Sequence, residues 1–202
     1  MSKQSLAHEY LEWTKQKLEE IDATLSALDD LVKTLKSDAR TKADAAIVQI
    51  RAARDAFKAK VDALRSDIAA SKAVADDTYV SLKAEWAEVE LAFQDFLAAA
   101  AGQANIVKQA VTDRAEAQRK SLHSSLQAIR ATASDALDQG RIEADAAISR
   151  LAAETEKAAA KLGQVSAAGD DSWKAIKGGL EEITSAYDRT WKKISEAIAR
   201  IR

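Results

Sequence analysis

The side chains in this sequence that could be catalytic or bind a metal are two histidines and several adjacent acidic pairs. His8 and His123 stand alone, and neither follows a glutamate by three residues, as the ligands of di-iron helical bundles do. Neighbours such as Glu19 and Glu20 diverge by about 100° around a helix, so they do not share one site. No HExxH, Walker A, GxGxxG or EF-hand motif occurs. The sequence therefore predicts no catalytic, cofactor-binding or metal-binding residues, and no enzyme.

The composition excludes further chemistry and favours long helices. The chain has 202 residues, no cysteine and no proline, which excludes disulfides and leaves helices uninterrupted. The 30 basic and 32 acidic residues nearly balance, which does not favour nucleic acid as a partner. The sequence shows neither a secretory signal nor the roughly 18 apolar residues of a membrane span. We expect a cytoplasmic protein that takes no small-molecule substrate.

Hydrophobic residues recur at steps of three and four along the first half of the chain. Three such stripes run over Leu11–Leu35, Ala43–Ile68 and Tyr79–Phe96, and Arg54 interrupts the second. This spacing is the coiled-coil heptad, in which two positions in seven form a narrow apolar stripe. The polar stretch 36–40 carries no stripe residue and is either a turn or a stutter in one long helix. We favour a turn, because a single stripe needs a partner.

The second half of the chain repeats this plan with smaller side chains. Helices are expected over about 103–136, 141–165 and 173–201. The apolar stripe of the first of these is formed by Val107, Val111, Leu122, Leu126, Ile129 and Ala133. The repeat aligns 76–83 with 170–177 and 43–47 with 144–148. These two offsets differ by one heptad, which a coiled coil accommodates without losing its register.

The repeat predicts two related three-helix units, over 1–101 and 102–202. The fold class we expect is all-α: an elongated antiparallel helical bundle or coiled coil. The sequence leaves open whether Gly102 ends a helix or lies within a continuous one. Alanine-rich stripes bury little area within one chain, so we also expect a homo-oligomer.

Gly178 and Gly179 lie inside the last expected helix, where each costs about 1 kcal/mol relative to alanine. Neither falls on the apolar stripe. They are compatible with a hinge or a close contact to another chain, and equally with neutral variation on an exposed face.

The C-terminal segment 189–202 combines an apolar face with basic flanks. Such a helix either continues the heptad packing of the bundle, which we favour, or lies in a membrane interface. The candidate interaction residues of this last helix are Trp173, Tyr187, Trp191, Lys192, Lys193, Ile194, Ile198 and Ile201.

The block Trp173–Glu182, with Tyr187 and Trp191 after it, resembles the C-terminal part of a family of bacterial coiled-coil stress-response proteins. Residues 18–22 resemble the N-terminal helix of that family. The likeness covers one unit, which this chain carries twice, and it implies no catalytic residues or cofactor. The three-helix units also look like spectrin repeats in plan. The proline-free amphipathic helices are similar to those of phasins and apolipoprotein-type lipid binders.

These observations predict a non-enzymatic, self-associating coiled-coil scaffold or interaction protein, with a stress-related role implied by the resemblance. The alternative is an amphipathic-helix protein whose bundle opens to bind lipid, membrane or storage-granule surfaces. A holdase-type chaperone rests on the family label alone. No cofactor is expected under any of these interpretations.

Overall fold

The computed structural model describes residues 3–70 and 76–132 of the chain. It also describes single helical positions beyond them: Ala146, Ser149, Arg150, Ala153, Gly178, Glu182, Ser185, Arg189 and Lys192. The described residues form helices and turns without any strand, which confirms the all-α class predicted from the heptad pattern.

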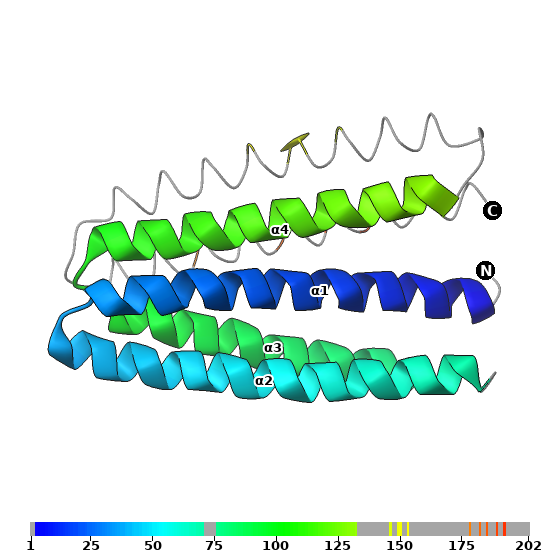
Figure 1. The fold of residues 1–202 in the computed structure, drawn as a ribbon, viewed down its shortest axis with the longest axis horizontal. Coiled ribbons are helices and arrows are strands. Elements are labelled where there is room, and N and C mark those ends of the chain that lie inside the picture. Colours follow the sequence, from blue (N-terminus) through cyan, green and yellow to red (C-terminus); the bar gives the residue numbers. More distant parts are fainter. Residues whose placement is uncertain are drawn as a thin grey trace. The chain divides into compact units, whose positions relative to one another are not determined.

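Long helices make up most of the described part (Figure 1). They are α1 (Lys3–Leu31), α2 (Ser37–Ala69), α3 (Asp76–Ala99) and α4 (Ala104–Thr132), and a short 3-10 turn, η1 (Val32–Thr34), follows α1. The 33 residues of α2 form a rod of about 50 Å at 1.5 Å per residue.

The chain divides into two compact units, Met1–Ala100 and Ala101–Arg202. This boundary lies beside the one predicted between 1–101 and 102–202. The first unit contains α1, α2 and α3. In the second unit α4 is described, whereas the further helices expected over about 141–165 and 173–201 lie outside the described residues except at single positions.

A turn separates the first apolar stripe from the second, as the sequence favoured, but most of the polar stretch 36–40 is helical. Leu35 and Lys36 have extended backbones, with ψ of 148° and 153°, and the Leu35 N–H donates to the Val32 carbonyl at 3.2 Å. Ser37 then begins α2. The reversal therefore occupies 32–36, slightly earlier than the stretch 36–40 that the missing stripe residues indicated.

Gly102 lies in the turn between α3 and α4, which settles the alternative that the sequence left open. The backbone of Gly102 is not left-handed, and a Cβ added there would meet no atom within 4 Å. The turn at this position therefore does not require glycine.

The three helices of the first unit run antiparallel to their chain neighbours. Arg51 and Arg54 of α2 pair with Asp29 and Asp22 of α1, so residue numbers rise along one helix as they fall along the other. Phe57 and Lys60 of α2 contact Trp86 and Ser81 of α3, so residue numbers again rise along one helix as they fall along the other. Helix α2 therefore contacts both of its neighbours, and α1 and α3 run parallel.

The predicted stripes form the core of this unit. Buried residues of the second and third stripes are Ala43, Ile47, Ile50, Phe57, Val61, Leu64, Leu82, Val89, Phe93 and Phe96. Leu18, Ile68 and Trp86 of the predicted stripes are only half-buried. Leu97 and Ala100, which the stripe of α3 did not include, are fully buried. The buried face of α3 is therefore wider towards its C-terminus than a strict heptad predicts.

Candidate functional site

Polar side chains lie buried in α1 beside its apolar stripe. Lys17 and Glu20 have side chains only 3 % and 0 % exposed, and Gln16 and Thr24 are buried as well. Lys17, Glu20 and Thr24 continue the heptad steps that begin at Trp13, so they share one face of the helix. We call Trp13, Lys17, Glu20 and Thr24 the polar stripe of α1.

Sequence reasoning missed this stripe, because it placed charged residues on a solvated face. The signal that could have revealed it is Trp13. A tryptophan seven residues before Glu20 marks a second face that is buried, and Lys17 and Thr24 fall on the same face.

Lys17 and Glu20 form an ion pair inside the bundle. The Lys17 Nζ lies 3.0 Å from the Glu20 Oε2 and 3.9 Å from the centroid of the Trp86 ring in α3. The carboxylate and the electron-rich ring face together replace the water that the ammonium group loses on burial. Neither side chain reaches the surface, and Lys17 joins α1 to α3 through its contact with the Trp86 ring.

Three aromatic rings from three helices meet next to this pair. The ring of Phe57 in α2 lies between those of Trp13 in α1 and Trp86 in α3, at centroid distances of 5.9 and 6.4 Å. Both contacts are edge-to-face, the arrangement that the charge distribution of aromatic rings favours. The rings therefore fix all three helices of the first unit at one level.

Some buried polar atoms of α1 make no hydrogen bond among the described residues. They are both amide atoms of Gln16, the hydroxyl of Thr24 and the Oε2 atom of Glu12. A buried polar group left unpaired costs about 1–3 kcal/mol. These three residues of α1 therefore contribute less to the stability of the bundle than apolar side chains of the same size would.

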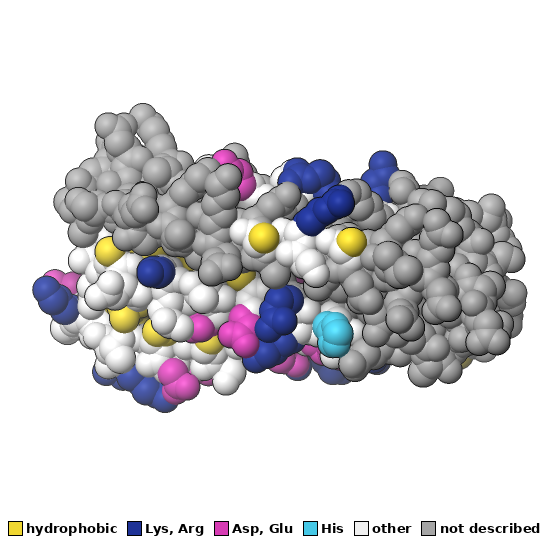
Figure 2. Space-filling model, turned by 90° about the horizontal axis from the view of Figure 1, so that it is seen from above, with side chains coloured by type: hydrophobic (Ala, Val, Ile, Leu, Met, Phe, Trp, Pro, Cys, Tyr) yellow, Lys and Arg dark blue, Asp and Glu magenta, His cyan; other side chains and the backbone are white. Residues whose placement is uncertain are grey.

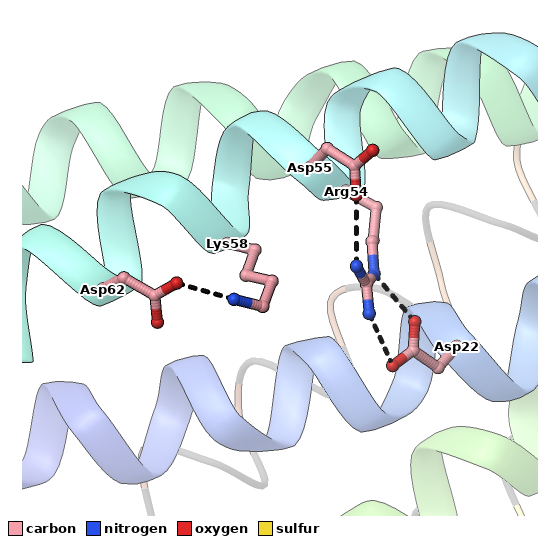
Figure 3. A network of polar contacts seen from close by, with 5 residues as sticks. All are labelled: Asp22, Arg54, Asp55, Lys58 and Asp62. Carbon is pink, nitrogen blue, oxygen red and sulfur yellow. Dashed lines mark hydrogen bonds and ion pairs between the residues drawn. The ribbon is translucent and has the colours of Figure 1, made fainter.

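The Arg54 side chain of α2 binds α1 at the edge of the core (Figure 3). The Arg54 guanidinium donates from Nε and Nη2 to the two carboxylate oxygens of Asp22, at 2.9 and 3.1 Å, and from Nη1 to Asp55 at 3.1 Å. These hydrogen bonds raise the pKa of Arg54 above its ordinary value. Arg54 thus interrupts the apolar stripe of α2 because it joins α2 to α1 in a planar, two-point contact.

Other surface charges pair within a single helix. Lys58 donates to Asp62 at 2.6 Å, and this hydrogen bond lowers the pKa of Asp62 (Figure 3). Lys120 lies 2.8 Å from Glu116 in α4 and lowers its pKa in the same way. On the face drawn in Figure 2, basic and acidic side chains lie beside one another. Such exposed pairs support the helix by only a few tenths of a kcal/mol each.

Apolar residues also follow the outer face of α3 at heptad steps. Val80 and Leu91 are 65 % and 55 % exposed, and Ala84 and Ala87 between them are exposed too. We call these four residues the outer stripe of α3. Val48 on α2 is the other large hydrophobic residue that the described part exposes widely, at 62 %.

Comparison with protein-family models, with curated proteins and with solved structures finds no match for this chain. The resemblance to bacterial coiled-coil stress-response proteins therefore stays a prediction, and the function has to be argued from the geometry.

The candidate interaction residues of the last helix fall mostly outside the described residues. Of the eight, only Lys192 is described; it is helical and exposed. The other seven lie outside the described part: Trp173, Tyr187, Trp191, Lys193, Ile194, Ile198 and Ile201. Gly178 is helical, and a Cβ added there would meet no atom within 4 Å, so the close-contact interpretation gains no support within the chain.

The remaining candidate groups form no site in the described part. His123 lies exposed on α4, and the side chain of His8 is not described. Among the described residues, no group of three or more histidine, aspartate or glutamate side chains could hold a metal ion. No described helix has both the length and the apolar character needed to cross a membrane.

Helix α4 buries polar residues where the sequence predicted only a gap in its stripe. Val107 and Val111 are buried as predicted, and Arg114, Gln118 and Ser121 follow them on the same face, all at most 6 % exposed. The Ser121 hydroxyl donates to the Gln118 carbonyl at 3.0 Å. The predicted stripe residues Leu122, Leu126, Ile129 and Ala133 have side chains outside the described part.

Proposed function

We propose that this protein is a non-enzymatic coiled-coil interaction protein, a scaffold that associates with copies of itself. The observation that supports the proposal best is the outer stripe of α3. This helix already buries one heptad face, with Leu82 and Val89, in the core of the first unit. Its opposite face repeats the heptad spacing with exposed Val80 and Leu91. A second apolar heptad on a packed helix is the pattern that joins helices of different chains.

The size of the stripe predicts a weak, concentration-dependent association. Full burial of an exposed valine or leucine stabilises a complex by about 1.5–3 kcal/mol, and the stripe offers two such residues per chain. The lost freedom of two associating chains costs about 4–15 kcal/mol. We therefore expect the dissociation constant of one such contact to be micromolar or higher. Several contacts acting together in a larger assembly bind more tightly than one contact alone.

The interior of the first unit suits this role. The Lys17–Glu20 pair and the three rings around it stabilise one arrangement of α1, α2 and α3. Polar groups inside coiled coils select one register over others at a cost in stability. A fixed internal arrangement keeps the outer stripe of α3 on the surface, where a partner reaches it. Under this proposal the scaffold works in the cytoplasm, and its stress-related role rests on the resemblance alone.

The average molar mass in solution tests the proposal. Sedimentation velocity and light scattering are measured from about 1 to about 500 µM protein. We expect the mass to rise with concentration above that of one chain, 21.8 kDa. A mass that stays at one chain over the whole range would overturn the proposal.

Flotation with anionic liposomes distinguishes the lipid-binding alternative. Under the proposal the protein stays in the bottom fraction, and its tryptophan emission does not change. Co-flotation with a blue shift of the emission would favour an amphipathic helix that inserts its apolar face, and it would count against a scaffold that acts by self-association alone.

A further inference from the structure

We propose that the outer stripe of α3 pairs with the same stripe of a second copy, antiparallel and in a single register. This inference rests on the proposed self-association and adds the surface, the direction and the register. The partner is a second copy of the same chain, because the charged residues beside the stripe meet residues of opposite charge when two copies of α3 lie antiparallel.

The heptad spacing assigns a position to each residue of the stripe. Ala84 and Leu91 take one of the two core positions, and Val80 and Ala87 take the other. In an antiparallel pair, each of the two core positions faces the other core position of the second copy. Ala84 then faces Ala87 of the second copy, and Val80 faces Leu91 of the second copy. All four layers are apolar, and the two alanine layers let the helix backbones approach closely.

Charged residues flank these layers on both sides. Lys83 precedes Ala84 and Glu90 precedes Leu91, so both occupy the same flanking position of the heptad. In an antiparallel pair, this flanking position faces the same flanking position of the second copy. In the proposed register Lys83 lies opposite Glu90 of the second copy, and the two-fold axis repeats this pair. On the other flank Ser81 lies opposite Glu88, so no like charges meet. Lys83 and Glu90 also interact within their own chain, and the pairs across the dimer add to those interactions.

The same charges disfavour the neighbouring arrangements. A shift of one heptad in one direction brings Glu90 opposite Glu90, and a shift in the other direction brings Lys83 opposite Lys83. In a parallel pair, Lys83 lies beside Glu88 of the second copy, but Glu90 lies beside Asp95, so repulsion offsets the attraction. Each alternative therefore contains a like-charge pair that the proposed register lacks.

Charge reversal tests the register in the full chain. The variants Lys83→Glu and Glu90→Lys each set like charges against each other twice per dimer. We expect each single reversal to raise the dissociation constant about tenfold at low salt. The double reversal should return the dissociation constant to within about threefold of the original. A parallel dimer responds differently, because Glu90→Lys would then face Asp95 and strengthen association.

The restoration is the decisive result. Lys83 and Glu90 each have interactions within the chain, and reversing both charges disturbs both of those interactions. When both single reversals weaken association, recovery by the double reversal requires a direct pairing of 83 with 90 across the dimer. Urea unfolding of each variant measures the effect within the chain separately. If the double variant associates as weakly as the single ones, the proposed register is wrong.

Cysteine cross-linking provides a second, independent measurement. The chain contains no cysteine, so each introduced thiol is the only one present. In an equimolar mixture of Ala84→Cys and Ala87→Cys, we expect oxidation to give the mixed dimer faster than either variant alone gives its own dimer. Residues 84 and 87 face each other in the proposed register, within reach of a disulfide. The matched control is Ala52→Cys, an exposed alanine on α2, which should cross-link slowly.

The outcomes separate this inference from the proposed function. A wild-type chain that remains monomeric overturns both. A wild-type chain that associates, but without the charge effect and without the mixed cross-link, overturns the antiparallel pairing of α3 and leaves self-association standing. Cross-linking of Ala87→Cys with itself, faster than in the mixture, indicates a parallel pair and contradicts the inference.

Discussion

Lys17 and Glu20 are the residues at which the core of the first unit departs from an apolar coiled coil. Their charges balance each other in a space that excludes water, and the Trp86 ring covers the ammonium group. Removing one charge takes from the other the ion-pair partner it has at 3.0 Å, whereas removing both leaves neither charge of this pair to be compensated. The effects of substituting Lys17 and Glu20 on the free energy of unfolding should therefore be far from additive.

Glu20→Leu should lower the free energy of unfolding by about 3–5 kcal/mol, because Lys17 then stays buried without its carboxylate. The double variant Lys17→Met/Glu20→Leu should recover most of this loss. Urea unfolding followed by tryptophan fluorescence measures both. A single variant that costs less than about 1 kcal/mol, or a double variant as unstable as the single one, would contradict a buried pair.

Asp62 gives a prediction for acid pH. Lys58 lowers the pKa of Asp62 below the ordinary 3.8, so the folded state favours the charged carboxylate. This contribution is present at neutral pH and is lost as the pH falls through the lowered pKa. Asp62→Asn should therefore show a shallower decrease in stability between about pH 5 and about pH 3 than the original chain. Since Asp62 lies on the surface, high salt should reduce the difference, and equal slopes in low salt would refute the pairing.

At the scale of elements, each helix carries two faces whose roles differ. Helix α3 buries Leu82, Val89 and Phe93 on one face, and it exposes Val80 and Leu91 on the other. The heptad pattern of the sequence predicts only the first apolar stripe of each helix, because one stripe is enough to form a coiled coil. The second faces of α1 and α3 became visible only once neighbouring helices were in place.

The turn between α3 and α4 gives a prediction at this scale. Gly102 has no left-handed backbone and no atom within 4 Å of an added Cβ, so alanine fits without strain. Gly102→Ala should raise the free energy of unfolding by about 0.4–1 kcal/mol, because it restricts the unfolded chain. Thermal unfolding measures the change. A destabilised variant would show that the turn needs the freedom of glycine after all.

Substitution of Gly178 tests whether this glycine contacts another chain or is a neutral residue on an exposed helix face. The residue is helical and an added Cβ has free space, so Gly178→Ala should stabilise the protein by about 1 kcal/mol through helix propensity. Circular dichroism during urea unfolding measures the gain. If the variant loses association while its stability rises, the glycine contacts another chain, and the neutral interpretation is wrong.

At the scale of the whole molecule, the chain holds two compact units whose described cores differ in chemistry. Both units bury polar groups, such as Lys17 in α1 and Arg114 in α4. The first unit also buries large aromatic side chains, such as Phe57 and Phe93, whereas the buried apolar residues of α4 are valines and alanines. Apolar burial stabilises a fold roughly in proportion to its area, and buried polar groups offset part of that gain.

A fragment of residues 1–100 should therefore fold on its own with a higher urea midpoint than a fragment of residues 101–202. Separate expression and unfolding of the two fragments, followed by circular dichroism, makes the comparison. The same helical signal and midpoint for both fragments, or a higher midpoint for 101–202, would contradict the difference in core chemistry.

The candidate site shows where prediction from the sequence ended. The turn near 32–36 and the core stripes of α2 and α3 could be predicted, because side-chain spacing within one helix is enough to show them. The polar stripe of α1 could not be predicted by the rule that charged residues are solvated. The burial of Lys17 follows from the position of Trp86, 69 residues later in the chain.

By itself, the sequence determined that this protein is helical, where its first apolar faces lie and where α1 turns back towards α2. These properties depend on residues within one or two heptads of one another. Only the tertiary structure decided that Lys17 and Glu20 are inside, that Arg54 reaches Asp22, and that the outer stripe of α3 remains exposed. Burial depends on which helices come together, and residues far apart in the chain control that.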